Sequence, residues 1–508
     1  MGTKVTRRRF LTAVSAGATY LALTNTVGCN LLERTSKVRL SRTPKASPLR
    51  IPKVWPLSSD SSAPPKGVWA FRSHPNLSPP AVEVSTQAHE TAPGYIFTAP
   101  KKGPGQDGPM IIDNLGQPVW FSKGKYALDF KVQYYQGKPV LTWWEGDPFP
   151  RPSVGEYVIL DSSYREITRV QAGNGHQGNQ HEFLVTPQDT ALFTVYNPVR
   201  RDLSPLGGPK DGLVMEGIIQ EVDIETGEVL FEWHSLEYVN PDESYRKPKY
   251  RKYFDYFHIN SIDVDHDDNL LISARHTSAV YKVDRKSGQI IWRLGGKKSD
   301  FEMGPGTRTG YQHDARRQRD GTITIFDNGS VNEVEQSRGI VVELDEDAMT
   351  AKLVREYTHP DKLLSTSQAN MQVLPNANVF IGWGSEPFIS EFSRDGKLLF
   401  NAHFLPNIHS YRAFRFPWKG QPQDAPAVVA ESGPDDKVTL YASWNGATEV
   451  ATWDVLTGPR PSRLEPLGSV PRHGFETAML AQTSDPCVAV RAKHRSGRVL
   501  GTSVPIEL

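Results

Sequence analysis

Four stretches of this chain repeat one pattern, and three of them carry a histidine at the same place. They begin His181-Glu-Phe-Leu-Val, His258-Ile-Asn-Ser-Ile, His313-Asp-Ala-Arg-Arg and Asn370-Met-Gln-Val-Leu, and each continues through a polar turn into a second apolar run. Each reads as a β-hairpin whose first strand opens on a polar residue. A short repeat of this kind cannot bury its apolar face alone and must stack on its neighbours.

A second kind of hairpin follows each copy of the first. Two earlier copies of the first kind are expected at residues 81–100 and 129–144, and the second kind begins at Met110, Tyr157, Gln220, Tyr281, Val341 and Ile389. Six inner and six outer hairpins make six four-stranded units, which predicts an all-β fold with a six-bladed β-propeller. A string of β-sandwiches is the alternative all-β arrangement.

The repeated hairpin pattern is absent on both sides of this array. We expect the propeller over residues 67–420 and a small C-terminal β-sandwich, fibronectin- or immunoglobulin-like, over residues 424–508. Residues 30–66 are rich in Pro and Ser without periodicity and are expected to form a tether.

Residues 1–29 resemble an export signal. The run Thr6-Arg7-Arg8-Arg9-Phe10-Leu11 matches the twin-arginine pattern, and an uncharged, moderately apolar stretch follows it. A membrane anchor is the alternative. Thr26-Val27-Gly28-Cys29 resembles a lipoprotein cleavage box, so Cys29 is a candidate for lipidation. The sequence therefore predicts an exported, periplasmic or extracellular protein, with a lipid anchor at Cys29 left open.

Charge and cysteine content narrow the function further. The 58 Lys and Arg residues nearly balance the 57 Asp and Glu residues. The chain therefore lacks the large positive charge that would attract nucleic acid. Cys29 and Cys487 are the only cysteines, and Cys487 lies in a strand-like run, so we expect it to be a core residue without a disulfide. The oligomeric state stays open.

Arranged radially, the inner hairpins place His181, His258 and His313 at one end of a central channel. Arg275 ends the strand that returns from His258, so its guanidinium reaches the same end. The neighbouring residues Asn260, Asp314, Arg316 and Arg317 complete the candidate cluster. Imidazoles beside guanidinium groups suit an anion with several oxygens, such as sulfate or phosphate. Six other histidines lack this registration and are expected to be structural: His176, His234, His266, His276, His403 and His473.

Several longer motifs resemble the arylsulfotransferase family, in its fungal and actinobacterial-like branch. They are Phe71-Arg-Ser-His-Pro, Leu141-Thr-Trp-Trp-Glu-Gly, Phe257-His-Ile-Asn-Ser-Ile-Asp, Ser273-Ala-Arg-His, Gln312-His-Asp-Ala-Arg-Arg, Phe326-Asp-Asn-Gly and Ser443-Trp-Asn-Gly-Ala-Thr-Glu-Val. The resemblance implies a six-bladed propeller that moves a sulfuryl group from an aryl sulfate donor to a phenolic acceptor through a sulfohistidine, without a nucleotide sulfate, a cofactor or a metal.

Carried over residue by residue, the resemblance makes His313 the nucleophile. His258 and Arg275 would hold the sulfuryl oxygens or protonate the bridging oxygen, and His181 would complete the catalytic set. Asn260, Arg316 and Arg317 are expected to bind the substrate. Two other functions remain open: a metal-dependent lyase or hydrolase built on the histidines, and a propeller that binds partners without catalysis.

Overall fold

The computed structural model describes residues 53–57, 67–124, 126–149, 152–249, 252–329 and 335–508. Within these residues the chain is all-β, as predicted: 36 strands form eight sheets, and the short helix α1 (Ser235–Tyr238) and the 3-10 turns η1 (Ser204–Leu206) and η2 (Pro241–Glu243) are the helical elements. No helix in the described part of the chain is long and apolar enough to span a membrane. The twin-arginine start and Cys29 lie outside the described residues.

Four of the sheets each use four consecutive antiparallel strands, ordered from first to last along the chain. The first is β6 (Ala127–Tyr135), β7 (Lys138–Asp147), β8 (Val154–Leu160) and β9 (Glu166–Val170), and the second is β10 (Gly178–Val185), β11 (Thr190–Arg201), β12 (Gly212–Asp223) and β13 (Val229–His234). The third is β15 (Ile259–Val264), β16 (Leu270–Ala274), β17 (Ala279–Val283) and β18 (Ile290–Gly295), and the fourth is β20 (His313–Arg317), β21 (Ile323–Asp327), β22 (Arg338–Asp345) and β23 (Thr350–Thr358). The short strands β14 (Phe254–Asp255) and β19 (Glu302–Met303) add parallel partners to β12 and β23.

Two further sheets combine strands from both ends of this region. In one, β28 (His409–Phe416) pairs with β3 (Tyr95–Lys101), followed by β4 (Met110–Ile112) and β5 (Pro118–Phe121). In the other, β24 (Asn370–Val373), β25 (Val379–Gly382), β26 (Phe388–Phe392) and β27 (Leu398–Phe404) are completed by β2 (Val82–Thr86). The predicted hairpin over 81–100 is therefore wrong. Its two strands lie in different sheets, because each pairs with a late strand that would otherwise leave an open edge.

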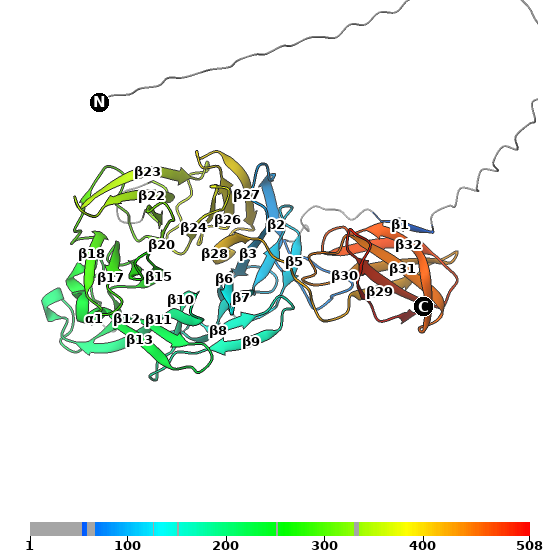
Figure 1. Ribbon diagram of the computed structural model, residues 1–508, viewed down its shortest axis with the longest axis horizontal. Helices are drawn as coiled ribbons and strands as arrows, with labels where there is room; N and C mark the ends of the chain where they lie inside the picture. Colours follow the sequence, from blue (N-terminus) through cyan, green and yellow to red (C-terminus); the bar gives the residue numbers. More distant parts are fainter. Residues whose placement is uncertain (1–52, 58–66, 125, 150–151, 250–251, 330–334) are drawn as a thin grey trace, which may run out of the picture. The chain divides into compact units, whose positions relative to one another are not determined.

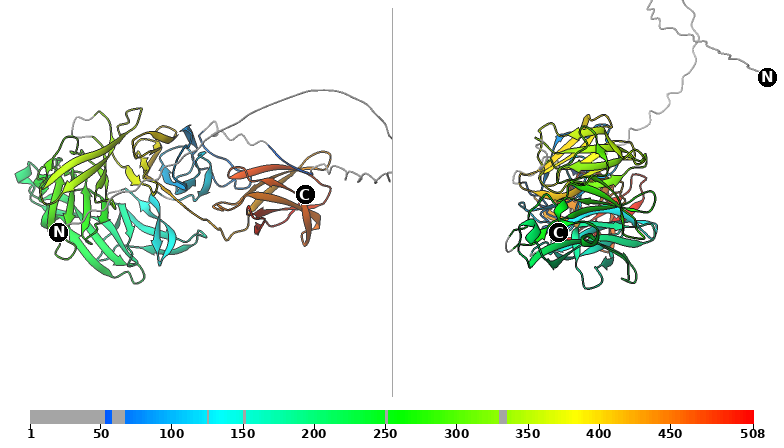
Figure 2. Two further views of the ribbon diagram at one scale, coloured as in Figure 1. Left: turned by 45° about the horizontal axis from the view of Figure 1, so that its top comes forward. Right: turned by 90° about the vertical axis from the view of Figure 1, so that its left-hand side faces the viewer.

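The first strands of these six sheets contact one another in a closed cycle. β6 contacts β10, β10 contacts β15, β15 contacts β20, β20 contacts β24, β24 contacts β28, and β28 contacts β6. Figure 1 shows these six strands nearest the middle, with the other strands of each sheet outside them, and Figure 2 shows the same sheets from two other sides. We call β6, β10, β15, β20, β24 and β28 the inner strands.

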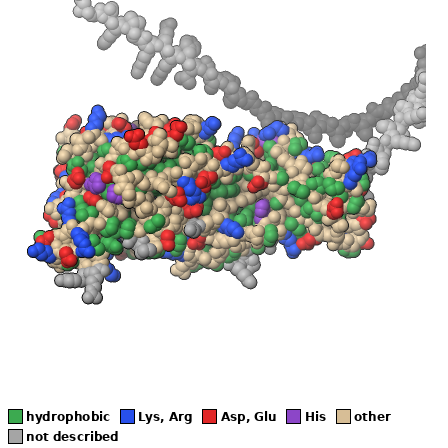
Figure 3. All heavy atoms as spheres, turned by 90° about the horizontal axis from the view of Figure 1, so that it is seen from below, with side chains coloured by type: hydrophobic (Ala, Val, Ile, Leu, Met, Phe, Trp, Pro, Cys, Tyr) green, Lys and Arg blue, Asp and Glu red, His purple; other side chains and the backbone are tan. Residues whose placement is uncertain are grey.

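The core lies between neighbouring sheets. Each neighbouring pair shares one apolar cluster; one cluster, for example, joins Phe97 and Trp120 to Phe130, Leu141 and Trp143. Fully burying one such side chain stabilises the fold by about 1.5–3 kcal/mol. The strands are held by these packed faces, which explains why the apolar runs were readable in the sequence. On the surface, Figure 3 shows acidic and basic side chains interspersed, as the near-zero net charge leads one to expect.

The remaining two sheets hold the C-terminal strands. One is β29 (Ala427–Ser432), β30 (Lys437–Ser443), β33 (Glu476–Gln482) and β1 (Val54–Pro56); the other is β31 (Thr452–Arg460), β32 (Arg463–Pro471), β34 (Cys487–Lys493), β35 (Val499–Thr502) and β36 (Ile506–Glu507). A shared apolar cluster joins the two sheets, and Cys487 is buried as predicted. Because Val54 pairs with Ala481 in β33, the predicted tether over 30–66 is wrong at 54–56, where the chain forms an edge strand.

Candidate active site

The three predicted histidines lie at the starts of three successive inner strands. His181 belongs to β10, His258 precedes β15 and His313 opens β20, and they are only 6%, 8% and 2% exposed. The rings of His181 and His258 meet edge to face with centroids 4.7 Å apart, and His181 and His313 line the same cavity. We call these three residues the histidine layer.

Register shifts at these strand starts aim the side chains inward. The pairing of β10 with β11 shifts between Gly178 and Phe183, that of β15 with β16 between Ile259 and Ser261, and that of β20 with β21 between His313 and Arg316. A β-bulge bends a strand and lets consecutive side chains leave the strict alternation of faces. His258 also adopts a left-handed φ of 62°, a conformation that costs a non-glycine residue about 1–3 kcal/mol and is concentrated at functional sites.

Asn328 fixes the tautomer of His313. Its Nδ2 donates to the carbonyl oxygens of Ser365 and Gln368, at 2.7 and 3.2 Å, so its Oδ1 faces Nδ1 of His313 at 2.7 Å. Nδ1 must then carry the proton, and Nε2 keeps a lone pair, which accepts from the backbone N–H of Gln368 at 3.2 Å. Burial first, and then the positive charge of Arg275, lower the pKa of His313 to about 3. The imidazole is therefore neutral at physiological pH.

Arg275 lies beside this ring as predicted. Its Nη2 donates to Thr366 O at 2.9 Å, its Nη1 lies 2.8 Å from Nε2 of His276, and the guanidinium stacks on Tyr311 at 4.6 Å. Burial lowers its pKa, yet a guanidinium stays charged under ordinary conditions. The histidine layer thus has one fixed planar cation next to it.

His276 belongs to the cluster, which corrects the expectation that it is structural. Its ring lies 4.6 Å from that of His258, and its Nδ1 lies 2.6 Å from Asp255 O. The Oδ2 of Asp255 lies 2.5 Å from Nδ1 of His258. Burial, together with the charge of His258, lowers the pKa of His276 to about 3. Asp255 and His276 therefore orient His258 and Arg275 from behind.

These residues also form the candidate metal group. Ligand atoms of Asp255, His258 and His276 lie within 4.8 Å of one another, whereas His181 and His313 are not part of any such group among the described residues. The fit to a cation is poor, because an N–H of Arg275 points at Nε2 of His276 and a guanidinium repels a metal ion. The predicted site with three histidine ligands does not form.

The three residues predicted to bind substrate form hydrogen bonds and ion pairs within the protein instead. Asn260 is fully buried, and its Nδ2 donates to Gln312 O at 2.7 Å, which holds the residue before His313. Arg316 bonds Asp314, Glu182 and Ile262 O, and Arg317 bonds both carboxylate oxygens of Asp265. The predicted substrate-binding role of Arg316 and Arg317 is therefore wrong. Since a strand rises by roughly 3.3 Å per residue, both lie along β20 away from the mouth where His313 stands.

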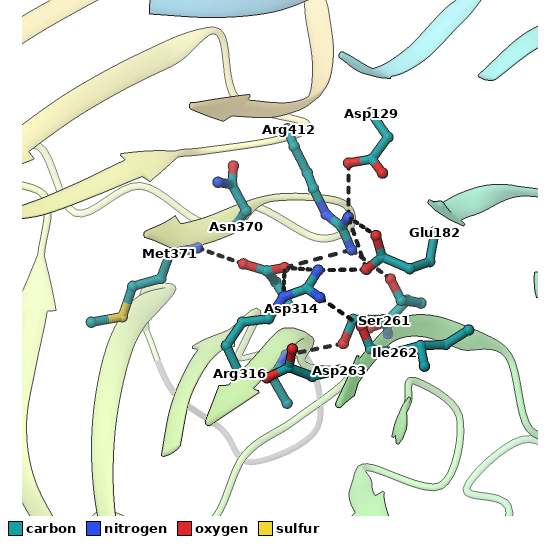
Figure 4. A network of polar contacts seen from close by, with 12 residues as sticks. Asp129, Glu182, Ser261, Ile262, Asp263, Asp314, Arg316, Asn370, Met371 and Arg412 are labelled. Carbon is teal, nitrogen blue, oxygen red and sulfur yellow. Dashed lines mark hydrogen bonds and ion pairs between the residues drawn. The ribbon is translucent and has the colours of Figure 1, made fainter. Parts of the chain in front are cut away.

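A second layer of buried charges adjoins the histidine layer in the sequence, since Glu182 follows His181 and Asp314 follows His313. It contains three cations and three carboxylates, which we call the ion-pair layer: Lys131, Arg316 and Arg412 with Asp129, Glu182 and Asp314. Figure 4 labels all of these residues except Lys131. Arg412 is fully buried and bonds Asp129 at 2.8 Å, Glu182 at 3.1 Å and Asn260 O at 2.7 Å. Burial alone would raise the pKa of Glu182, but Arg316, Arg412 and Lys131 hold it well below its usual value.

A cavity of about 210 Å³ opens beside His181 and His313. Besides the two histidines, its wall combines aromatic and apolar side chains with polar and basic ones: Tyr126, Leu128, Pro148, Phe149, Tyr411, Gln180, Ser367, Gln368, Lys101 and Lys102. Tyr196 stacks on His181 from behind, with centroids 5.2 Å apart. A larger hollow of about 630 Å³, beside α1 and η1, includes none of the predicted residues.

Sequence reasoning missed several of these residues, although one signal was present. Arg275 and Asn328 both follow directly on the second strand of their sheet, and Lys101 ends the second strand of another. A polar residue at that place reaches the mouth where the inner strands begin. Asp255, Gln368 and Arg412 had no such signal, because the first two lie outside the repeated hairpins and the last lies in the closing strand β28.

Comparison with known proteins identifies the family. The family model described as Arylsulfotransferase (ASST) matches residues 131–405, more than half of the 508 residues. The chain belongs to the arylsulfotransferase family. The matched segment of this arylsulfotransferase family member holds all three histidines and Arg275, whereas Lys101 and Arg412 lie outside it.

Other comparisons give weaker likenesses to this arylsulfotransferase family member. No curated protein matches it. Among solved structures, a protein of unknown function from Bacteroides caccae shares 14% identity over 63% of this chain and 98% of its own, with a TM-score of 0.38. A catalytically inactive virginiamycin B lyase from Staphylococcus aureus shares 9% identity over 79% of this chain and 100% of its own, with a TM-score of 0.33. TolB from Acinetobacter baumannii shares 13% identity over 63% of this chain and 67% of its own, with a TM-score of 0.34.

Proposed function

We propose that this protein transfers a sulfuryl group from an aryl sulfate to a phenol, and that Nε2 of His313 carries the group between them. The observation that carries the proposal is the fixed tautomer of His313: Asn328 binds the protonated Nδ1, so the lone pair lies on Nε2. A pKa of about 3 keeps this imidazole neutral and ready to attack. Membership of the arylsulfotransferase family supports the same reaction.

In the first half-reaction, Nε2 attacks the sulfur, an N–S bond forms and the bond from sulfur to the aryl oxygen breaks. The backbone N–H of Gln368 must first release Nε2. Negative charge builds up on the sulfuryl oxygens and on the departing phenoxide, where Arg275 can stabilise it. His258, held by Asp255, can deliver a proton to the phenoxide oxygen.

In the second half-reaction, an acceptor phenol occupies the place that the first phenol left. His258 takes the phenolic proton, the phenolate oxygen attacks sulfur, and the N–S bond to His313 breaks. His181 lines the cavity beside His313, where it can contact either phenol. Because both phenols use one place in turn, the kinetics should be ping-pong.

The proposal includes the architecture. We interpret the six sheets around the inner strands as the blades of a six-bladed β-propeller, supported by the closed cycle of contacts and by the two sheets that join early and late strands. The two C-terminal sheets would then form the β-sandwich, supported by the apolar cluster between them. This arrangement brings histidines from three sheets to one mouth.

We also propose that the protein is exported by the twin-arginine route. Whether Cys29 carries a lipid anchor is left open in this proposal. The supporting observation is the Arg7-Arg8 pair before an apolar run. Replacing Arg7 and Arg8 with Lys should leave active protein in the cytoplasm, measured by activity in cell fractions. Normal export of that variant would contradict the proposal.

The reaction is tested with 4-nitrophenyl sulfate as donor and phenol as acceptor, in buffer without nucleotide sulfate and with a chelator present. We expect nitrophenolate release that depends on phenol, with parallel lines in double-reciprocal plots. A requirement for a nucleotide sulfate would contradict the proposal.

A metal-dependent reaction is the second candidate, because Asp255, His258 and His276 bring their ligand atoms together. It predicts that activity is lost in the chelator and returns with a divalent cation, and that the purified protein contains metal. Sulfuryl transfer through His313 predicts neither.

A further inference from the structure

The cavity beside His313 contains a buried lysine without a carboxylate partner. Within the described residues three lysines are buried: Lys101 is 6% exposed, Lys131 5% and Lys282 7%. Lys131 bonds Asp129 and Glu182, and Lys282 lies close to Asp265, Asp267 and Glu346. Lys101 has no ion pair within the described part of the chain, and its Nζ donates to the neutral side-chain oxygen of Gln368 at 3.0 Å. Lysine is rarely buried unless it is paired, so this ammonium group has room for an anion that the chain itself does not supply.

The position of Lys101 relates it to His313. Gln368 contacts both: its side-chain oxygen accepts from Lys101, and its backbone N–H donates to Nε2 of His313. One glutamine, from backbone nitrogen to side-chain oxygen, thus spans the gap between the amine and the nucleophile.

The cavity that Lys101 and His313 share also suits an aryl ring. Tyr126, Phe149 and Tyr411 line it with aromatic faces that suit an aryl ring, and Lys101 lines it too. Lys101 also resembles Arg275 in its place: Lys101 ends β3, where it pairs with His409 at the start of β28, and Arg275 directly follows β16, whose last residue pairs with Ile259 at the start of β15. The mouth is therefore flanked by two cations, and Arg275 already serves the sulfuryl group in the mechanism above.

We propose that Lys101 binds an anionic substituent on the aromatic ring of the substrate, so that the enzyme prefers phenols and aryl sulfates that carry a carboxylate or a sulfonate away from the reacting oxygen. This inference rests on the proposed function, because it assigns the ring of the donor or acceptor to the cavity beside His313. Lys101 is a specificity residue in this account and takes no part in the transfer of the sulfuryl group.

The charge of Lys101 responds to its surroundings. Burial first, and then repulsion by Lys102, lower the pKa of Lys101 to about 7, and Asp107 opposes this shift. Lys102, Asp107, His409, His181, His313, Tyr126 and Tyr411 are the titratable groups on the elements around it. Because Lys101 is protonated below its pKa, the preference for an anionic substrate should be strongest at low pH and decline as pH rises through about 7.

The test compares acceptors that differ only in the ring substituent: phenol, 4-hydroxybenzoate and 4-hydroxybenzenesulfonate, each with 4-nitrophenyl sulfate as donor. Lys101→Gln keeps the length and the hydrogen bond but removes the charge, and Lys138→Gln is the matched control, because it removes a charge from an exposed lysine outside the cavity wall. We expect Lys101→Gln to raise KM for the anionic acceptors by about tenfold to a hundredfold, with KM for phenol and kcat unchanged. The control should change the ratio of the two KM values by less than about threefold, as expected for an exposed charge.

The proposal would be overturned if Lys101→Gln raised KM for phenol and for 4-hydroxybenzoate equally, or raised neither. If the variant does not fold, the wild-type protein decides: the ratio of kcat/KM for 4-hydroxybenzoate over phenol should fall as pH rises from 6 to 8.5, and a flat ratio would overturn it. If no acceptor is sulfated at all, the proposed function fails, and calorimetric binding of 4-hydroxybenzoate in preference to phenol still supports the anion site, whereas equal binding contradicts it.

Discussion

The histidine layer and the ion-pair layer share two strands, β10 and β20, in which they take consecutive residues, yet they do opposite things. His181 is followed by Glu182 and His313 by Asp314; in each pair the first residue lines the cavity and the second is locked into ion pairs. The histidines are held in place mainly by neutral groups and carboxylates at Nδ1, which leaves Nε2 of His313 for chemistry. The ion-pair layer satisfies its charges internally. One residue step along a strand thus separates a reactive surface from a fixed support.

This comparison predicts that changes in the ion-pair layer act first on stability. Arg412→Met leaves the buried carboxylates of Asp129 and Glu182 without one of their cations, and removing one partner of a buried ion pair costs about 3–5 kcal/mol. The free energy of unfolding, measured in urea at pH 7, should fall by that amount, and activity should be lost with the fold. A stable, active Arg412→Met protein would break the comparison.

Changes in the histidine layer should instead act on activity and spare the fold. His313→Asn removes the nucleophile at a strand end while it keeps a polar side chain, so transfer from 4-nitrophenyl sulfate to phenol should fall below about a hundredth of the wild-type rate. The melting temperature serves as the control and should change by only a few degrees. Retention of more activity would exclude His313 as the carrier.

Arg275 shares a feature with each layer: it is charged, like the ion-pair layer, and it lies beside the histidine layer. We expect its replacement to act on activity. Arg275→Lys keeps a charge but loses the planar fork, so kcat should fall by about tenfold to a thousandfold, the range for one donor to a developing oxyanion. An unchanged rate with a lower melting temperature would move Arg275 into the supporting layer.

The smallest expected effect concerns pH and stability. The pKa of His313 falls from 6.5 to about 3 on folding, so the unfolded chain binds a proton that the folded protein refuses. This neutral imidazole therefore favours folding above pH 6.5, and the contribution is lost as pH falls toward 3. Between pH 6.5 and 4.5, the melting temperature of the wild type should drop by a few degrees more than that of His313→Asn. Equal slopes would show that His313 is not buried in its neutral form.

The sequence predicted the parts of the molecule that depend on repetition. Alternating apolar runs and turns identified the sheets, and the histidines at equivalent places in three repeats identified the mouth. It failed where the chain departs from the repeat. The hairpin at 81–100 was wrong because ring closure pairs its strands with late ones. The role of Arg316 was wrong because nearness to His313 in the sequence does not bring its guanidinium to the cavity; it bonds Asp314 and Glu182 instead.

Residues that reach the site from outside the repeats were not predictable by this reasoning. Gln368 and Ala369 have left-handed φ angles of 68° and 87°, which no local turn signal indicates, and this segment delivers the N–H that meets His313. Arg412 belongs to the closing strand, so its charge enters the centre only once the ring is complete. Such contacts are made by tertiary closure rather than by local pattern.

The central claim is that Nε2 of His313 carries the sulfuryl group. It is tested most directly by mixing the protein with 4-nitrophenyl sulfate in the absence of an acceptor and measuring the intact mass. The account predicts one added sulfuryl group on the wild-type protein, its disappearance when phenol is added, and no addition to His313→Asn. Nitrophenol release without any added mass, or the same addition to the variant, would contradict it.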